Sequence, residues 1–462
     1  MKALFITSIL LGALLQTPQM QQPVVLVGGT IIDVSNLGKS GSDIKDSIVV
    51  IRGGQIVAAG PREGVRIPWN AKLFDVATKY IVPGLNDAFA TQNNQAQANA
   101  HLYMGVTSIV GLDEPDGRRG PLYLRANPSP RVYRLAVIEG YDEGKLTPPP
   151  RTIADLRARG TALSEEQLVK QVDTLAESGI KVLLLQYELS AEQVRVVARR
   201  ARELHIATIG ELGFTTYYDA IKAGVNAFVH SSRYSLELAP AELRKEVAGA
   251  PFGPPRIKYY QFLASLSAND PAVKRYASVL ASGRVALIPT LSLFYLELPD
   301  HKNLWNEPAA AILDPRDIHL PANPLTGNRD NPDQSVRDSF PPGLADNELR
   351  IEEQYQNAGA RYIAGSGTDA FGTLPGVSLH TELKLLTRAG LTPREAIAAA
   401  TSNFGELFGW KNVGQVKIGY NADLLVLDEN PVNDIEKLKK IHMVILNGEI
   451  LDRDKLLLKR LR

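Results

Sequence analysis

The 462-residue sequence contains no cysteine. Disulfide bonds, thiolate nucleophiles, lipid attachment through cysteine and cysteine-ligated zinc are therefore all excluded. Any metal site in this protein has to be built from His, Asp, Glu or Lys side chains.

The sequence also lacks an excess of charge of either sign, because 51 Lys and Arg residues are balanced by 50 Asp and Glu residues. A protein without a basic field or a charged tail is not expected to bind nucleic acid. The composition favours a small-molecule ligand or substrate as the partner.

No apolar run is long enough to cross a bilayer. The stretch from Ala3 to Leu15 follows a single lysine, and this pattern is typical of the apolar region of an export signal. A buried N-terminal strand is the alternative interpretation. We predict a signal peptide at residues 1–20 and an exported chain, periplasmic or secreted, without a membrane span. The oligomeric state stays open, a homo-oligomer included.

Short β-branched runs separated by glycine pairs fill residues 24–78 and return in residues 416–462. Turns are expected at Gly28-Gly29 and Gly53-Gly54, and Asn447-Gly448 is a strong hairpin signal. The two ends of the chain are therefore predicted to form one small composite β-sandwich of antiparallel strands.

Residues 79–415 alternate apolar runs of strand length with helical periodicity eight times. Two of the predicted helices begin with capping boxes, at Ser164 with Gln167 and at Ser190 with Gln193. Apolar strands flanked by helices indicate a parallel sheet that is buried on both faces. Eight such units predict an α/β fold, the (β/α)8 TIM barrel. A doubly wound open sheet is less consistent, because no Gly-x-Gly-x-x-Gly fingerprint follows an early strand.

Pro, Asn and Asp crowd residues 300–346, between the seventh and eighth predicted strands. This segment is longer than an ordinary connection. We expect an inserted loop on the face of the barrel where the carboxyl ends of the strands meet, either a lid or a surface excursion. A shorter proline-rich loop at residues 146–152 is expected on the same face.

Several motifs in a fixed order resemble the amidohydrolase superfamily, in its imidazolonepropionase-like and prolidase-like branch. The motifs are VVLVGGTIID, IRGGQIVAAG, KYIVPGLND, GVTSIV, GVSLHTELKLLTRAGLTPREAIAAATSNFGELFG and GQVKIGYNADLLVLDENP. The resemblance extends from about Val24 to Leu451 and implies a barrel that holds one or two divalent metals. It also implies the ligands: His-x-His on the first strand, a carboxylated Lys or a Glu on the fourth, a His on the fifth and sixth, and an Asp on the eighth.

This sequence departs from that ligand pattern at four of six positions. The two first-strand positions hold Phe89 and Thr91, and the fourth-strand position holds Leu184. The remaining positions hold Glu211, His230 and Asp369. Because none of the seven histidines belongs to a His-x-His pair, no shift of the alignment restores the first-strand ligands.

Other residues near the predicted strand ends complete the expected cleft. We expect the cleft to be lined by Phe89, Thr91, Leu184, Gln186 and Tyr187. Three residues are expected to serve structure: Asp87 in its turn, and His101 and His380 packed on helices.

Two functions remain open. The first is a pseudoenzyme whose binuclear metal site is degenerate, with lost or much reduced hydrolase activity and a ligand in the old cleft. The second is an active hydrolase of C–N bonds in amides, cyclic amides or dipeptides. It would use His230 and Asp369 as catalytic groups, with one Zn or Mn ion on Glu211, His230 and Asp369, or metal-free acid/base chemistry. Three protein ligands plus water is the arrangement of catalytic zinc. We favour the first, because the constellation of a metal hydrolase is incomplete.

Overall fold

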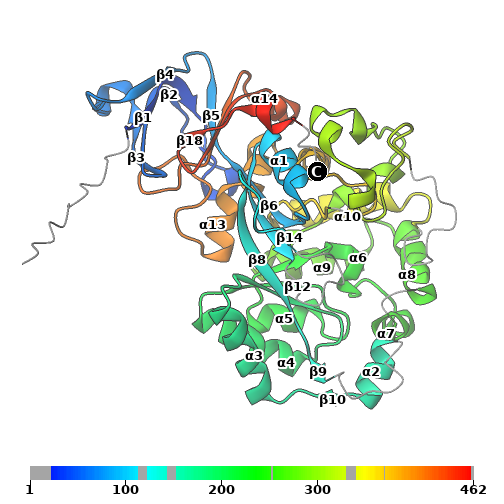
Figure 1. The fold of residues 1–462 in the computed structure, drawn as a ribbon. Helices are drawn as coiled ribbons and strands as arrows, with labels where there is room; N and C mark the ends of the chain where they lie inside the picture. The colour runs from blue at the N-terminus through cyan, green and yellow to red at the C-terminus, as the bar shows by residue number, and fades with distance from the viewer. Residues whose placement is uncertain are drawn as a thin grey trace, which may run out of the picture.

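The computed structural model describes residues 22–112, 122–142, 152–250, 253–328, 340–368 and 370–458. The predicted signal peptide lies outside these residues, as does nearly all of the proline-rich loop at 146–152. The ribbon shows a barrel with flanking helices and, beside it, a β domain in which blue and red segments from the two ends of the chain meet (Figure 1). No helix in the described part of the chain combines the length and apolar character that a bilayer crossing requires.

One eight-stranded sheet forms the β domain, in the order β18-β17-β16-β5-β1-β2-β3, with β4 paired to β1. Its strands are β1 (Val24–Ile31), β2 (Ile44–Arg52), β3 (Gln55–Pro61), β4 (Lys72–Asp75), β5 (Tyr80–Pro83), β16 (Leu424–Leu427), β17 (Ile441–Leu446) and β18 (Glu449–Ile450). A separate β domain built from both chain ends is thus confirmed. The strands are not all antiparallel as predicted, because β1 pairs in parallel with β4 and β5.

Two of the three predicted glycine turns are present. Gly53-Gly54 joins β2 to β3, and Asn447-Gly448 joins β17 to β18. The turn predicted at Gly28-Gly29 was wrong. These two glycines lie inside β1, where the register to β2 shifts and Gly28 has φ +93°. A positive φ inside a strand produces a bulge, which bends the strand without ending it.

Eight parallel strands form the barrel, in chain order around the sheet. They are β6 (Leu85–Ala90), β7 (Val106–Leu112), β8 (Arg131–Ile138), β11 (Val182–Leu185), β12 (Ala207–Gly210), β13 (Ala227–Val229), β14 (Ala286–Ile288) and β15 (Arg361–Tyr362). The predicted α/β barrel is confirmed. The first predicted strand is divided at Gly84, so that β5 belongs to the β domain and β6 to the barrel. A side chain at Gly84 would collide with Thr107.

Main-chain hydrogen bonds close the barrel between its first and last strands. The N–H of Ala88 donates to the carbonyl of Ala364 at 2.9 Å, and the N–H of Gly367 donates to the carbonyl of Phe89 at 2.8 Å. These bonds attach the end of β6 to the segment that follows β15. The first-strand ligand positions are thereby held beside the segment that leads to Asp369.

Helices cover the outside of the barrel. They are α1 (Gln95–Tyr103), α2 (Ile153–Arg159), α3 (Glu165–Glu177), α4 (Ala191–Glu203), α5 (Tyr217–Ala223), α6 (Ser231–Ser235), α7 (Ala241–Gly249), α8 (Pro254–Ser265), α9 (Pro271–Ser282), α10 (Leu344–Asn357), α11 (Val377–Arg388), α12 (Pro393–Ala399), α13 (Ser402–Phe408) and α14 (Arg453–Leu456). The capping boxes predicted at Ser164 and Ser190 begin α3 and α4.

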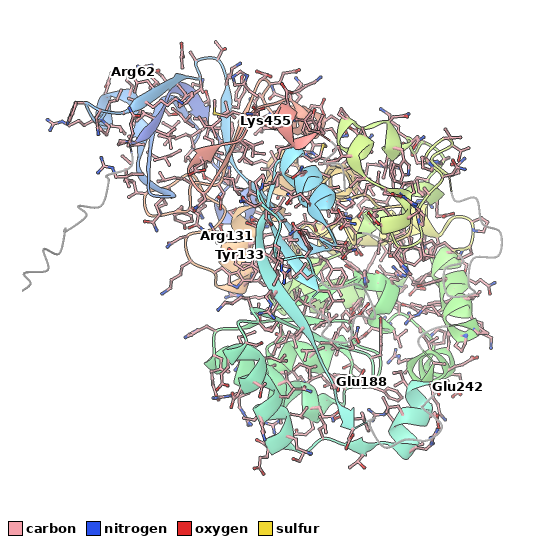
Figure 2. The ribbon with its side chains drawn as sticks, viewed as in Figure 1. Arg62, Arg131, Tyr133, Glu188, Glu242 and Lys455 are labelled. Carbon is pink, nitrogen blue, oxygen red and sulfur yellow. The ribbon has the colours of Figure 1, made fainter. Side chains whose placement is uncertain are left out.

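Apolar side chains fill the interior of the barrel. Leu184, Ile209, Val229 and Ile288 are fully buried there. An aromatic cluster packs against this core near the start of β8, where the rings of Tyr133 and Trp410 stack with centroids 4.0 Å apart. Figure 2 shows Tyr133 beside helix α13.

The predicted insertion at residues 300–346 contains short 3-10 helices and the start of α10. The 3-10 helices are η4 (Leu304–Asn306), η5 (Pro308–Ile312) and η6 (Pro315–Asp317). Asn94, at the start of α1, donates a hydrogen bond to the carboxylate of Asp317 at 2.9 Å. This contact holds η6 against the residues that follow β6.

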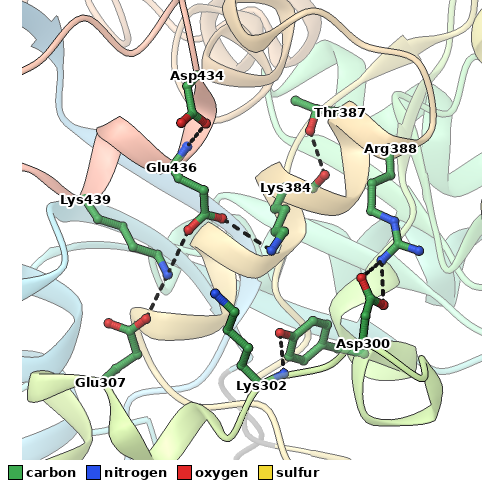
Figure 3. Close-up of polar contacts among 10 residues, drawn as sticks. Asp300, Lys302, Glu307, Lys384, Thr387, Arg388, Asp434, Glu436 and Lys439 are labelled. Atoms are coloured by element: carbon green, nitrogen blue, oxygen red, sulfur yellow. Dashed lines mark hydrogen bonds and ion pairs between the residues drawn. The ribbon is translucent and has the colours of Figure 1, made fainter.

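Ion pairs attach the same insertion to α11 and to η8 (Ile435–Lys439) (Figure 3). Arg388 pairs with Asp300 at 3.2 Å, and Lys439 pairs with Glu307 at 2.8 Å. The carboxylate of Glu436 lies between Lys439 and Lys384, at 3.7 and 3.8 Å. Residues 300–317 are therefore fixed at several points, as expected of a surface excursion.

Candidate active site

Glu211 and His230 meet at the carboxyl ends of neighbouring strands. Glu211 directly follows β12 and His230 directly follows β13. Oε1 of Glu211 lies 3.3 Å from Nε2 of His230, and the two residues are only 3% and 6% exposed. The structure thus brings together two of the three predicted metal ligands.

Gln186 and Thr290 hold the far sides of this pair. Nε2 of Gln186 donates to Oε2 of Glu211 at 3.1 Å. Nδ1 of His230 lies 2.5 Å from Oγ1 of Thr290, whose hydroxyl donates to the carbonyl of Pro289. The imidazole is thus held through Nδ1, and its Nε2 faces Glu211.

Thr290 was not predicted as a site residue from the sequence. A signal was available, since Thr290 lies two residues beyond β14 in VALIPTL, at the strand end where functional groups gather in barrels. Both His230 and Thr290 have left-handed backbones, with φ of +61° and +53°. This conformation costs on the order of 1–3 kcal/mol in a residue other than glycine, and such strain concentrates at functional sites.

Phe89 and Thr91 occupy the end of β6. The ring of Phe89 contacts the ring of His230 edge to face, with centroids 5.5 Å apart. Oγ1 of Thr91 is buried and has no hydrogen-bond partner among the described residues. The carbonyl of Thr91 lies 3.0 Å from Nε2 of His101. Burial lowers the pKa of His101 to about 4, so its imidazole is neutral and packed, as predicted.

The other residues predicted to line the cleft are buried to different degrees. Leu184 is fully buried in the barrel interior, whereas Gln186 is partly exposed. Tyr187 is 5% exposed, and its carbonyl accepts a hydrogen bond from the N–H of Phe214. Leu184 therefore belongs to the apolar floor beneath the Glu211–His230 pair.

Asp87 braces the closed barrel, in agreement with its predicted structural role, although it lies inside β6 and not in a turn. Its carboxylate accepts hydrogen bonds from the N–H and the hydroxyl of Ser366, at 2.8 and 2.5 Å, and from the N–H of Phe89 at 3.2 Å. Burial raises the pKa of Asp87 to about 6, although the bonds from Ser366 oppose the shift.

Three further carboxyl groups are buried around the barrel, and sequence reasoning did not find them. Glu382 on α11 accepts the N–H of Ser292 at 2.7 Å, and burial raises its pKa to about 8. On α10, burial raises the pKa of Glu348 to about 8 and that of Glu352 to about 7. Their burial could not be read from the pattern, because glutamate on a helix is usually a solvent-facing residue.

Asp369 lies outside the described residues. Among those that are described, no three His, Asp or Glu side chains converge on a possible metal position. At the predicted ligand positions of the first and fourth strands, Phe89 and Leu184 offer no donor atom to a metal ion. A single ion is compatible with the donor chemistry of Glu211 and His230, which lie in contact.

Known proteins resemble this chain in sequence and in fold. Residues 310–451 match the sequence model of the Amidohydrolase family. Ochratoxinase of Aspergillus niger is 38% identical over 96 residues, a segment that spans 20% of this chain and only 19% of that protein. In sequence, this chain thus resembles the amidohydrolase family over residues 310–451.

Solved structures share the fold over nearly the whole chain. Bottromycin amidohydrolase has a TM-score of 0.63 at 19% identity, covering 94% of this chain and 87% of its own. A Xaa-Pro dipeptidase has a TM-score of 0.60 at 14% identity, covering 93% and 100%. The A. niger ochratoxinase structure has a TM-score of 0.58 at 18% identity, covering 93% and 95%. At these identities the likeness concerns the fold alone.

Proposed function

We propose that this protein is an amidohydrolase-fold protein that has lost binuclear metal catalysis and keeps its cleft as a small-molecule binding site. The contact between Phe89 and His230 carries the proposal. It places a hydrocarbon ring against the one retained histidine, at the position where the family supplies a nitrogen ligand.

The loss of donors has a direct chemical consequence. Removal of groups that merely orient a metal ligand weakens binding by about 10- to 100-fold, and removal of the ligands themselves costs at least as much. Without a bound cation, a water molecule in the cleft keeps a pKa of about 15.7 and is a poor nucleophile at neutral pH. Hydrolysis of an unactivated amide is then expected to be slow.

A reduced catalytic site is the second candidate, and the 3.3 Å contact between Glu211 and His230 favours it. Glu211, His230 and Asp369 would hold one zinc or manganese ion, which would lower the pKa of a bound water. Without metal, Nε2 of His230 could exchange a proton with Glu211, while Thr290 fixes the imidazole through Nδ1.

The substrate class of this second candidate is proposed from the relatives. The names of bottromycin amidohydrolase and the Xaa-Pro dipeptidase refer to amides and dipeptides. Both contain a C–N bond between a carbonyl and an amine. Amides, cyclic amides and dipeptides are therefore the compounds to test.

Metal analysis separates the two candidates. The chain is purified without chelator, and zinc and manganese are measured in the wild type and in Asp369→Ala and Glu211→Gln. The first proposal expects far less than one ion per chain in all three proteins. Near-stoichiometric metal in the wild type that disappears in both variants would contradict it and support the second candidate.

Export is a separate proposal, based on the apolar run at Ala3–Leu15 behind one lysine. A chain expressed with its own N-terminus should be recovered outside the cytosol. A chain that begins at residue 22 should stay inside, and equal distribution of both would contradict export.

A further inference from the structure

A cavity of about 290 Å³ lies beyond the carboxyl ends of β12 and β13, outside the contact between Glu211 and His230. The loop after β12 and the segment from α6 to α7 form its walls. Its lining residues include Phe214, Leu236, Glu237, Arg244, Lys245 and Ala248. Figure 2 labels Glu242, which marks α7 at this side of the molecule. The volume lies near the lower end of the range for ligand pockets, so a small ligand is expected.

Three buried polar atoms in this wall lack a hydrogen-bond partner within the described residues. They are Oγ of Ser235, Oε2 of Glu237 and Nε of Arg244, and the last two belong to ionisable side chains. The other carboxylate oxygen, Oε1 of Glu237, accepts the N–H of Tyr217. Nη2 of Arg244 donates to the carbonyls of Glu237 and Ala239, at 3.1 and 3.2 Å. Buried polar groups without a partner destabilise the fold, so a ligand that pairs Oε2 of Glu237 and Nε of Arg244 would recover this free energy.

The remaining wall combines apolar surface with a second cation. Phe214 is 37% exposed, and the guanidinium of Arg157 lies 4.1 Å from its ring centroid, which fixes the ring. Leu236 and Ala248 are buried beside the cavity. Lys245 is exposed on the same helix as Arg244 and carries a positive charge at the rim.

We infer that this cavity binds a free α-amino acid with an apolar side chain. The ammonium group of the ligand pairs with Oε2 of Glu237. Its carboxylate pairs with Nε of Arg244 and with Lys245. Its side chain packs on Phe214 and Ala248. A zwitterion of this kind pairs with Oε2 of Glu237 and with Nε of Arg244 at once, and it brings no net charge into the cavity.

Other ligand classes fit less well. A phosphate would bring two negative charges close to the carboxyl of Glu237, and a hydrocarbon would leave Oε2 and Nε unpaired. The inference does not depend on the proposed loss of catalysis. Gly213 is two residues from Glu211, so the two Cα atoms are at most about 7.6 Å apart. The amino acid is therefore held close to Glu211 but on separate groups.

Titration calorimetry on the full chain tests the inference with L-leucine, L-leucinamide and N-acetyl-L-leucine. The amide lacks the carboxylate and the acetyl compound lacks the ammonium. L-leucine is expected to bind at least about tenfold more tightly than either analogue, a difference of about 1.4 kcal/mol. Absence of leucine binding, or equal affinity for all three compounds, would overturn the inference.

Variants of Glu237 and Arg244 test the two proposed contacts with the ligand. Glu237→Gln should weaken leucine binding at least about tenfold, since the amide loses the charge that pairs with the ammonium. Arg244→Gln should weaken it similarly and should abolish the preference for leucine over leucinamide. Unchanged affinity in both variants would refute the assignment. The matched control is the exposed Glu192–Arg195 pair on α4, where Glu192→Gln and Arg195→Gln should leave binding unchanged.

A variant that fills the cavity tests the inference even if a polar substitution unfolds the chain. Ala241 is exposed at the start of α7 and lines the cavity, so Ala241→Trp should fill the cavity without disturbing the core. Loss of leucine binding with an unchanged melting temperature supports the site. Retained binding contradicts it. Glu211→Gln should bind leucine normally, which separates this site from the proposed function.

Discussion

The ring of Phe89 meets the imidazole of His230 edge to face, with centroids 5.5 Å apart and ring planes at 80°. Phe89→His would replace this hydrocarbon with a nitrogen donor close to His230 and Glu211. We expect the variant to bind Zn²⁺ or Co²⁺ at least about tenfold more tightly than the wild type. Titration calorimetry with Zn²⁺ and the visible spectrum with Co²⁺ measure the change.

The control for this variant is Tyr218→His, because Tyr218 is 50% exposed on α5 and adds a histidine without neighbouring ligands. An equal gain in both variants would show that the new histidine acts alone. The position of Phe89 would then not be a vestigial ligand position.

Asp87→Asn should loosen the closure of the barrel. The carboxylate of Asp87 uses both oxygens to accept bonds from Ser366, and an asparagine offers only one acceptor oxygen. We expect a loss of about 1–3 kcal/mol in the free energy of unfolding, measured by urea denaturation. Asp75→Asn is the control, because Asp75 is exposed on β4 and accepts one local bond. Equal stability of Asp87→Asn and the wild type would contradict the bracing role.

Stability should fall as the pH rises from about 5 to about 8. Burial raises the pKa of Glu382 and of Glu348 to about 8, above the usual value of 4.5 for an exposed glutamate. In this window the folded state binds protons that the unfolded state has released, so each rise in pH favours unfolding. Each group contributes at most about 1.4 kcal/mol per pH unit between its two pKa values.

Glu382→Gln should flatten this dependence. The amide keeps an acceptor for the N–H of Ser292 but cannot titrate. The melting temperature of the variant should therefore decline less than that of the wild type between about pH 6 and pH 8. Parallel melting profiles for the two proteins would show that Glu382 ionises in the folded state without cost.

Lys439→Ala should cost little stability, although Lys439 takes part in two of the ion pairs in Figure 3. Its side chain is 27% exposed and pairs with Glu307 and Glu436. Ion pairs near the surface contribute about 0–1 kcal/mol, and salt at about 1 M screens them. The loss should be below about 1 kcal/mol in low salt and smaller in high salt. A larger loss that persists in high salt would indicate that the alkyl chain of Lys439, not its charge, holds the insertion.

Local signals predicted most of the fold because they act over a few residues. The Ser164 and Ser190 capping boxes and the Asn447-Gly448 hairpin are all present. The turn predicted at Gly28-Gly29 was wrong for a physical reason. A glycine pair permits a positive φ but does not fix whether the chain turns back or bulges, since the pairing with β2 decides this.

The candidate site was less accessible to sequence reasoning. Glu211 and His230 could be placed at strand ends, but their 3.3 Å contact depends on the register of β12 against β13. The hydrogen bond between His230 and Thr290 joins residues that follow different strands and leaves no local pattern. The burial of Glu382 arises from packing between α11 and η3 (Leu291–Glu297), which no periodicity of a single helix reveals.

The joint between β5 and β16 has a consequence for how the molecule is made. Leu424 pairs with Pro83 and Val426 pairs with Ile81. Strand β5, which is synthesised early, therefore pairs with β16, which is synthesised late. A ribosome adds roughly 5–20 residues per second to the chain, and it makes the whole barrel after β5 and before β16. The N-terminal strands of the β domain therefore have an unpaired edge at β5 during much of translation. Nascent chains are most prone to aggregate in this interval.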